Sequence, residues 1–591
     1  MCGIFAVVND KSNQAAQTVL AGLKKLEYRG YDSWGIAIKP IENNTLLVEK
    51  HIGKIGQAQT TLPQGQIAIG HTRWATHGGV TDANAHPHLD CQKKIAVIHN
   101  GIVENYIDLK TELISRGHKF VSDTDTEVIA HLIEEKRKIG TMVDSVFECF
   151  NSLIGSNAIG VLDIETETII ACRNGSPLVL GIDEKNQQYF LGSDVPAFLK
   201  YTNRVYFIAD GEGVVINKNG VKIYDLKTKK EKTFKVEKLD WQLEDAEKAG
   251  FPHFLLKEIY EQKNTIAKTA TLNEKEMQKI TSLIEKNYQP IFIGCGSAYH
   301  CSLLGKYFFA EQGIDSTAYQ AHELAPFSKF INSKSLVIAI SQSGETADTL
   351  ISVKIAKKNG AHILAIVNSR GSTLERLADT VINVGAGPEI AVVSTKAFTS
   401  QLATLYLLSY AVSNKLAEGQ KQIKNLGQEL SKWLQPILIN QLINIAKTLI
   451  DEEHIYLIGK HLNFPAVLEF ALKIKETSYL HAEPFAAGEL KHGVITLIQK
   501  ETPCFVLASN DQAKNEILSS GAELEARGGK IIGVAPFANS EFNEFVKTPD
   551  LGNLTIFPNI IVGQLLGYYL GIGRGADPDK PRNLAKSVTV K

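Results

Sequence analysis

The sequence lacks most of the features that mark nucleic-acid-binding, secreted or zinc-knuckle proteins. Its 63 Lys and Arg residues balance 64 Asp and Glu residues, so a net charge of −1 gives no broad attraction toward nucleic acid or anionic membranes. The 7 cysteines include no C-x-x-C pair, which argues against a disulfide framework or a zinc knuckle. No ligand spacing indicates a metal, and we expect a protein of the reducing cytoplasm.

Long hydrophobic runs are also scarce. The longest uncharged stretch, Leu554 to Gly573, contains Pro558, Asn559, Gln564 and four glycines, which favour a buried strand-turn-helix over a membrane span. The N-terminus has neither the basic segment nor the apolar run of a signal peptide. We therefore expect a soluble protein with no membrane partner.

The 591 residues are too many for one hydrophobic core and predict several domains. Short apolar strands dominate the first two hundred residues, with helical patterns near Ala15 to Leu26 and Thr124 to Lys138. The charged segment 231–247 is typical of a linker. Beyond it, strands alternate with long helical patterns, which indicates α/β units around parallel sheets.

The second half of the chain repeats itself. The apolar segment 290–294 returns at 454–459, and the segment 336–341 returns at 505–509, both at offsets close to 168 residues. A third pair, 365–367 and 533–535, keeps the same offset. This regularity predicts two copies of one doubly wound domain.

Polar residues near the N-terminus suggest an amide-hydrolysing thiol enzyme. Removal of Met1 would place the thiol of Cys2 beside a free α-amine, whose pKa of about 7.7–8.0 suits a base at neutral pH. Asn100 and Gly101, directly after an apolar strand, could donate two hydrogen bonds to an oxyanion. Taken alone, Asn-Gly is typical of a hairpin turn, and the segment 123–127 of a capped helix start.

The second half offers groups suited to a sugar phosphate. The segment Ser341 to Thr346 follows a buried strand and precedes a helical pattern, a context in which hydroxyls and backbone N–H groups bind phosphate. Glu469, Lys473 and Glu476 fall on one face of an apolar helix, where charges are paired or functional. His492 stands in a glycine-flanked turn and suits a proton shuttle.

Several segments resemble the N-terminal-nucleophile glutaminase domain: Cys2–Phe5, Tyr28–Ser33, Arg73–His77, Asn84–His88 and Ser122–Glu127. From residue 2 to its last turn, the chain resembles the glutamine:fructose-6-phosphate amidotransferase (isomerizing) family. The resemblance implies an α+β N-terminal-nucleophile hydrolase sandwich (αββα) followed by two α/β doubly wound parallel-sheet sugar-isomerase (SIS) domains. The implied boundaries are a glutaminase domain at 1–235, a linker at 236–255, SIS domains at 256–425 and 426–575, and a tail at 576–591 that completes the synthase site.

The resemblance also implies the chemistry: L-glutamine and D-fructose 6-phosphate become glutamate and glucosamine 6-phosphate, without a cofactor, in a cytoplasmic homodimer. Cys2 would be the nucleophile, and Asn100 with Gly101 the oxyanion hole. Glutamine would be bound by Arg73, Trp74, Thr76, His77 and Asp125. In the synthase half, Glu476 would move the proton, His492 would open the sugar ring and Lys586 would form an imine, with Lys473 and Glu469 in support. Sugar phosphate would be bound by Ser297, Ser341, Gln342, Ser343, Thr346, Val393 and Ser394, and ammonia would pass Trp74, Ala585 and Val588.

Ala298 departs from the family pattern, because it replaces a residue whose hydroxyl lies near the phosphate. This departure leaves an alternative function open, namely a related amidotransferase that acts on another ketose phosphate in a specialised amino-sugar pathway. A regulatory sugar-phosphate sensor would lack the catalytic groups, yet Glu476, His492 and Lys586 are all present. A phosphoribosyl-transferring partner domain would need a pyrophosphate loop, and the sequence shows none.

Overall fold

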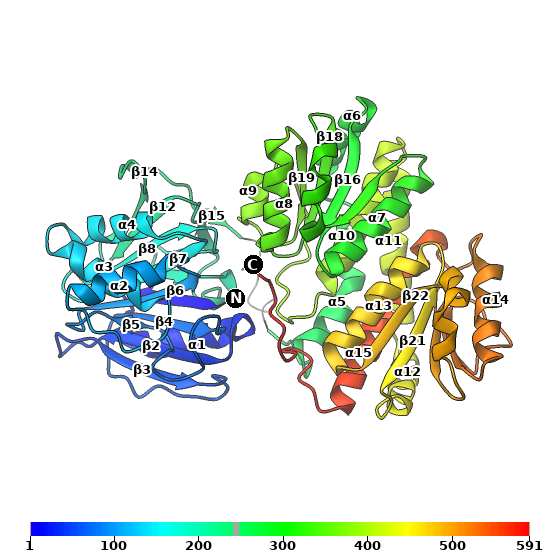
Figure 1. Ribbon diagram of the computed structural model, residues 1–591, viewed down its shortest axis with the longest axis horizontal. Helices are drawn as coiled ribbons and strands as arrows, with labels where there is room; N and C mark the ends of the chain where they lie inside the picture. The colour runs from blue at the N-terminus through cyan, green and yellow to red at the C-terminus, as the bar shows by residue number, and fades with distance from the viewer. Residues whose placement is uncertain (1, 240–246, 590–591) are drawn as a thin grey trace. The chain divides into compact units, whose positions relative to one another are not determined.

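The computed structural model describes residues 2–239 and 247–589. The chain divides into two compact units, one formed by Met1–Ala246 with Ala585–Lys591 and the other by Glu247–Leu584. Figure 1 shows a β-rich first unit and a second unit in which strands and helices alternate. The charged segment 231–247 contributes two short strands to the first unit, and its residues 240–246 lie outside the described part of the chain.

The first unit contains two sheets whose strand pairs are antiparallel. The eight-stranded sheet has the order β15-β11-β9-β10-β1-β4-β2-β3. Its strands are β1 (Gly3–Val8), β2 (Ser33–Lys39), β3 (Leu47–Ile52), β4 (Ile67–Arg73), β9 (Val179–Asp183), β10 (Gln188–Gly192), β11 (Arg204–Phe207) and β15 (Glu237–Lys238). The seven-stranded sheet has the order β14-β13-β12-β8-β7-β6-β5. Its strands are β5 (His88–Leu89), β6 (Ile95–Gly101), β7 (Asn157–Asp163), β8 (Thr168–Asn174), β12 (Glu212–Asn217), β13 (Gly220–Asp225) and β14 (Glu231–Lys232).

The central strands of this unit are apolar on both faces because each sheet is covered twice. Ile4 on β1 and Ile98 on β6 belong to one buried cluster between the sheets. Phe5, the next residue of β1, points the other way and packs against Gly22 of α1 (Ala15–Leu26). Val97 of β6 likewise faces away from the first sheet, into a cluster with helix residues. The alternation along each strand thus builds two cores, one on each face.

Helices complete four layers in the order helix, sheet, sheet, helix, which confirms the predicted αββα sandwich. Helix α1 covers the first sheet and has the predicted bounds. Helix α3 (Glu127–Arg137) lies within the predicted pattern and packs on the second sheet. Helices α2 (Tyr106–Ser115) and α4 (Met142–Ser152) were not expected. In α2 only Leu113 is fully buried, with Tyr106 and Leu109 partly buried against the same core, so its apolar face is narrow and easily overlooked.

The second unit contains two five-stranded parallel sheets with the same strand order. The first is β17-β16-β18-β19-β20 and the second is β22-β21-β23-β24-β25, which confirms the predicted repeat and the doubly wound class. The strands are β16 (Gln289–Gly294), β17 (Thr317–Gln320), β18 (Ser335–Ser341), β19 (His362–Val367), β20 (Thr380–Asn383), β21 (His454–Gly459), β22 (His481–Ala486), β23 (Pro503–Leu507), β24 (Lys530–Ala535) and β25 (Glu544–Lys547).

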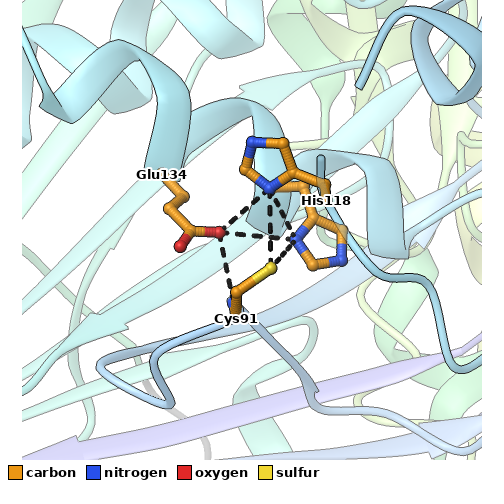
Figure 2. Close-up of side chains that lie close together, drawn as sticks. Cys91, His118 and Glu134 are labelled. Atoms are coloured by element: carbon orange, nitrogen blue, oxygen red, sulfur yellow. Dashed lines mark hydrogen bonds and ion pairs between the residues drawn. The ribbon is translucent and has the colours of Figure 1, made fainter. Parts of the chain in front are cut away.

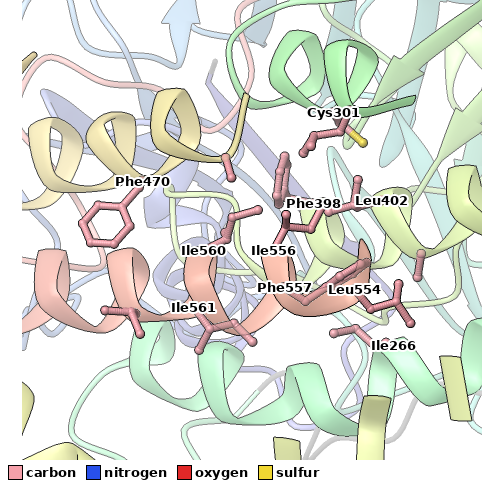
Figure 3. Close-up of a cluster of buried hydrophobic side chains, with 14 of the residues drawn as sticks. Ile266, Cys301, Phe398, Leu402, Phe470, Leu554, Ile556, Phe557, Ile560 and Ile561 are labelled. Carbon is pink, nitrogen blue, oxygen red and sulfur yellow. The ribbon is translucent and has the colours of Figure 1, made fainter. Parts of the chain in front are cut away.

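Helices pack around both sheets and join the two copies into one core. They are α5 (Phe254–Thr269), α6 (Glu274–Glu285), α7 (Ser297–Glu311), α8 (Ala347–Lys358), α9 (Thr373–Leu377), α10 (Lys396–Val412), α11 (Leu416–Trp433), α12 (Pro436–Thr448), α13 (Asn463–Ser478), α14 (Lys514–Glu525) and α15 (Ile556–Gly573). A single buried cluster contains Phe292 and Phe398 from the first copy and Phe470 and Phe505 from the second. Figure 3 shows Phe398, Phe470 and Ile560 within this cluster.

The expectation of a strand in the apolar stretch 554–573 is wrong, because α15 occupies nearly all of it. Pro558 lies in the first turn of α15, where its missing N–H has no helical partner to lose. The glycines at 563, 567 and 571 form a stripe against α13, and a Cβ at Gly567 would lie 2.9 Å from the carbonyl oxygen of Lys473. Among the described residues, one helical segment, Gly552–Gly573, is long and apolar enough to cross a membrane. Within its most apolar 18-residue stretch, 83% is buried inside the protein.

Candidate functional site

Cys2 directly precedes β1 and lies beside the end of β4. The two strands pair so that Gly3 opposes Thr72, which brings Cys2 next to Trp74. The backbone N–H of Trp74 donates to Sγ of Cys2 at 3.2 Å, and the thiol donates to the Trp74 carbonyl oxygen at 3.6 Å. Burial raises the pKa of the Cys2 thiol, while the Trp74 hydrogen bond and the positive charges of Arg73 and Arg29 act in the opposite direction.

Asn100 lies at the end of β6 with its amide directed at Cys2. Its Nδ2 donates to the carbonyl oxygen of Cys2 at 3.0 Å. Nε2 of His71 lies 3.0 Å from Oδ1 of Asn100 and 2.9 Å from the carbonyl oxygen of His99. Burial lowers the pKa of His71 to about 3, so its ring is neutral and carries its proton on Nε2, facing these two acceptors. This donor fixes the Asn100 amide with its nitrogen toward Cys2.

Gly101 follows with a φ of +135°, and a Cβ there would lie 2.1 Å from the carbonyl oxygen of Ser156. Only glycine suits this position, where the strand ends beside β7. The structure therefore brings together Cys2, Asn100 and Gly101, the three residues expected to form the hydrolytic centre.

The residues expected to bind glutamine lie on two segments near Cys2. Arg73 ends β4, and its guanidinium donates to the carbonyl oxygens of Gly79 at 3.0 Å and Gly78 at 3.1 Å. Asp125 precedes α3 and accepts from the backbone N–H of Val103 at 2.7 Å. It is near enough to Arg73 for their opposite charges to interact. The structure thus places the expected carboxylate-binding and ammonium-binding groups in one region.

The remaining glutamine-binding predictions fall on the loop after β4. Trp74 packs edge-on against Tyr31, with 5.3 Å between the ring centroids. Thr76 is exposed, and His77 is half-buried with its ring against Tyr106. Contacts to glutamine by these residues stay predictions.

The predicted phosphate loop has the expected context in the second unit. Ser341 ends β18, and its Oγ accepts from the backbone N–H of Gly344 at 3.0 Å and lies 3.2 Å from Oγ1 of Thr346. Ser343 Oγ accepts from the N–H of Glu345 at 3.2 Å, and Gln342 is half-buried. Helix α8 starts directly after Thr346, so the N–H groups of its first turn and the helix dipole favour an anion at this loop. Because β16 lies between β17 and β18, the crevice at the carboxyl ends of β16 and β18 is the topological switch point where such folds bind ligands.

Helix α13 carries a buried cluster of charges. Nζ of Lys473 lies 3.2 Å from Oε1 of Glu469 and 2.7 Å from Oε2 of Glu476, as their predicted position on one helix face requires. Lys473 also donates to Oγ of Ser297 at 3.0 Å and to the carbonyl oxygen of Ser394 at 3.3 Å. Ser297 begins α7 of the first copy, so the cluster joins the two copies.

The two carboxylates of this cluster differ in their surroundings. Burial alone would raise the pKa of Glu469, but Lys473 and His300 keep it below its ordinary value, since Nδ1 of His300 lies 2.8 Å from Oε2 of Glu469. At Glu476 burial prevails over attraction to Lys473 and raises the pKa of the carboxyl. A carboxylate with a raised pKa is suited to accept and return a proton.

Six other predicted residues lie outside the Lys473 cluster or at its edge. Val393 is buried and Ser394 half-buried in the loop before α10, where Ser394 Oγ lies 3.2 Å from Oε2 of Glu389. His492 ends a short 3-10 helix, Ala487–His492, and its side chain is exposed. The tail residues Ala585, Lys586 and Val588 group with the first unit, and their roles stay predictions.

Sequence reasoning missed three residues that hold the proposed site residues in place. His71 orients Asn100, His300 binds Glu469, and Nε of Arg29 donates to the carbonyl oxygen of Cys2 at 3.2 Å. Arg29 lies within and His71 beside a motif that the sequence singled out, and His300 lies two residues after Ala298. Only their partners, distant in the sequence, reveal what they do.

Comparison with known proteins agrees with both halves of this geometry. The glutamine amidotransferase domain family matches residues 71–200, and the SIS domain family matches residues 282–411 and 448–553. A solved structure titled the C-terminal domain of glucosamine-fructose-6-phosphate aminotransferase from Francisella tularensis is 30% identical, with a TM-score of 0.51, and covers 56% of this chain and 100% of its own. Fold and site thus define a glutamine amidotransferase joined to a pair of SIS domains.

Full-length relatives narrow the class further. The glutamine–fructose-6-phosphate aminotransferases (isomerizing) of Thermococcus kodakarensis and Pyrococcus horikoshii are each 42% identical to this chain, over 100% of both partners. A relative from Thermus thermophilus with the same name is 41% identical, also over 100% of both. The chain belongs to the glutamine–fructose-6-phosphate aminotransferase (isomerizing) family.

Proposed function

We propose that this protein transfers the amide nitrogen of L-glutamine to D-fructose 6-phosphate, forming glucosamine 6-phosphate and glutamate. The observation that carries the proposal is the approach of the Asn100 amide to Cys2, 3.0 Å from the cysteine carbonyl oxygen, in a chain that also holds a buried Lys–Glu cluster and a phosphate-type loop. Membership of the family supports the same reaction.

The first half-reaction begins when the Cys2 sulfur attacks the amide carbon of glutamine. The α-amine of Cys2, freed by removal of Met1, takes the thiol proton and passes it to the departing ammonia. Asn100 Nδ2 and the Gly101 N–H stabilise the tetrahedral oxyanion, and water then hydrolyses the thioester to glutamate. Arg73 binds the substrate carboxylate and Asp125 its ammonium group.

The second half-reaction uses groups of the SIS pair together with Lys586 of the C-terminal tail. The loop Ser341–Thr346 with Ser297 binds the phosphate, and Val393 and Ser394 line the sugar. His492 opens the ring, and Lys586 activates the ketone as an imine, which ammonia displaces. Glu476 then moves a proton from C1 to C2, which its raised pKa favours. Lys473 and Glu469 hold Glu476 in place.

A related amidotransferase for another ketose phosphate is the alternative, and it rests on Ala298. This residue lies in the first turn of α7, directly after Ser297, and its methyl packs against the core. A hydroxyl there would offer one more hydrogen bond, worth about 1 kcal/mol. Its absence would weaken phosphate binding by several-fold.

The test is incubation with glutamine and a panel of ketose 6-phosphates, followed by mass spectrometry of the amino sugar. Glucosamine 6-phosphate formed fastest from fructose 6-phosphate supports the proposal, and a faster reaction with another ketose favours the alternative. Cys2→Ala should abolish glutamine hydrolysis while aldose–ketose interconversion continues. Glutamine hydrolysis that survives in this variant overturns the nucleophile assignment.

We further propose a homodimer that works in the cytoplasm, as the family resemblance implies. Light scattering of the purified protein at micromolar concentration tests the dimer directly. The domain boundaries at 235, 255, 425 and 575 remain proposals that limited proteolysis can test.

A further inference from the structure

Four side chains of the first unit converge outside the glutamine site. They are Cys91, in the turn after β5, His118, shortly after α2, and His131 with Glu134, one turn apart on α3. Sγ of Cys91 lies 3.5 Å from Nδ1 of His131 and 3.6 Å from Nδ1 of His118. The two Nδ1 atoms are 3.3 Å apart. Figure 2 shows Cys91, His118 and Glu134 pointing toward one another.

Glu134 supplies the fourth donor atom. Its Oε2 lies 3.1 Å from Nδ1 of His118 and 3.5 Å from Nδ1 of His131. Tetrahedral zinc, with bonds of about 2.3 Å to sulfur and 2.0–2.1 Å to nitrogen or oxygen, separates its ligands by about 3.3–3.6 Å. Five of the six distances among these four atoms lie between 3.1 and 3.6 Å, close to the edges of a zinc tetrahedron, and all four atoms lie within 4.8 Å of one another.

The outer nitrogens of the two histidines favour the same arrangement. Nε2 of His118 lies 2.8 Å from Oε1 of Glu135, and Nε2 of His131 lies 3.5 Å from Oε1 of Glu127. The carboxylate behind each imidazole favours a ring proton on Nε2, as around protein-bound zinc, through a hydrogen bond at His118 and through charge attraction at His131. The lone pairs of both Nδ1 atoms then point toward the same space as the Glu134 carboxylate oxygen and the Cys91 sulfur. A divalent cation at their centre satisfies all four.

We propose that Cys91, His118, His131 and Glu134 bind a structural Zn²⁺ ion. Four protein ligands leave no open position for substrate, so the site is structural rather than catalytic. The mixture of thiolate, two imidazoles and a carboxylate at tetrahedral spacing favours zinc over copper or iron. The ion would tie the turn after β5 and the segment after α2 to α3, the helix that Asp125 precedes.

Local sequence patterns give little indication of this site because its ligands come from three segments. Only His131 and Glu134 are close in sequence, and such a pair is common on helices. A zinc knuckle requires paired cysteines, whereas here a single cysteine meets its partners 27 and 40 residues further along the chain.

Metal analysis of the full-length protein, purified without a histidine tag from zinc-supplemented cells, tests the proposal. We expect about one zinc per chain, falling at least roughly tenfold in Cys91→Ser. Cys91 is exposed, so this substitution leaves the core intact. The matched control is Cys295→Ser. Cys295 belongs to a second cluster, with His322 and Asp348, that offers three ligands rather than four. The Cys295→Ser protein should still contain about one zinc per chain.

Cobalt substitution gives an independent readout. The Co²⁺ protein should show intense tetrahedral d–d bands and a thiolate charge-transfer band that Cys91→Ser abolishes. Removal of zinc by a chelator should lower the melting temperature of the wild type, and zinc should restore it, whereas Cys91→Ser should not respond. Less than about a tenth of a zinc per chain in the wild type, full zinc in Cys91→Ser, or stoichiometric copper or iron would each overturn the assignment.

Discussion

The neutral ring of His71 holds the side-chain amide of Asn100, with 3.0 Å between Nε2 and Oδ1. This contact decides which end of the amide faces Cys2. A reversed amide would present an oxygen to the developing oxyanion and repel it. In the proposed mechanism His71 is thus a positioning residue for the hydrolytic step.

Replacement of His71 should slow glutamine hydrolysis without weakening glutamine binding. Asn100→Ala removes the oxyanion donor and should lower kcat by about 10²–10³-fold. His71→Leu leaves the donor in place but loses its orientation, worth one hydrogen bond, so kcat should fall by about 2- to 10-fold at unchanged KM. His71→Gln keeps a donor and should recover part of the loss. A change in KM alone would contradict the positioning role.

The buried charges of α13 predict that replacing Lys473 lowers the stability of the protein much more than replacing the nearby Lys475. Lys473→Ala leaves Glu469 and Glu476 without their shared cation and should lower the free energy of unfolding by about 3–5 kcal/mol. Lys475, on the same helix, is half-buried and makes no ion pair among the described residues. Lys475→Ala should change stability by about 0.5 kcal/mol or less. Urea denaturation of both variants measures the difference, and equal effects would refute the pairing.

The raised pKa of Glu476 predicts the acid limit of sugar isomerisation. The group must be a carboxylate to accept a proton, so activity should fall as the pH drops through its pKa, above the ordinary value of 4.5. Isomerisation of fructose 6-phosphate without glutamine isolates this step. Glu476→Gln should abolish it at every pH. An acid limb below about pH 4, near the ordinary pKa of a glutamate, would contradict the assignment.

Buried neutral histidines should make the first unit sensitive to acid. His71 has a pKa of about 3 when folded, against 6.5 as its ordinary value, so between these values the unfolded chain binds the extra proton. Stability is therefore lost as the pH falls through this window, by about 1.4 kcal/mol per pH unit for this group. His71→Gln should flatten the slope by that amount between about pH 4 and 6, whereas His322→Gln, at an exposed histidine, should not. An unchanged slope in His71→Gln would show that this ring is protonated in the folded state.

Much of the fold could be predicted because the spacing of apolar residues along the chain indicates where helices and strands form. Helix α1 has the bounds that its apolar spacing predicts, and the repeat of β16 as β21 follows from matching strands at a constant offset. The face shared by Glu469, Lys473 and Glu476 needed only the geometry of a helix.

What could not be predicted depends on partners far apart in the chain. Pairing of His300 with Glu469 joins residues on α7 and α13, and no local pattern contains it. The error at α15 has a different cause, since its glycines break the sequence pattern of a helix. They lie in a helix all the same, because α13 passes close to them and leaves no room for side chains.

The hydrogen bond from Lys473 to Ser297 connects α13 of one SIS copy with α7 of the other. At the position equivalent to the serine loop of the first copy, the second copy has Asp511, which pairs with His461 at 3.2 Å, and such a carboxylate would repel a phosphate. The two copies thus differ in the groups they carry, since the first has the serine loop and the second the buried charges of α13. Under the proposed function, neither copy alone would supply both the phosphate loop and the charged helix that the synthase reaction requires.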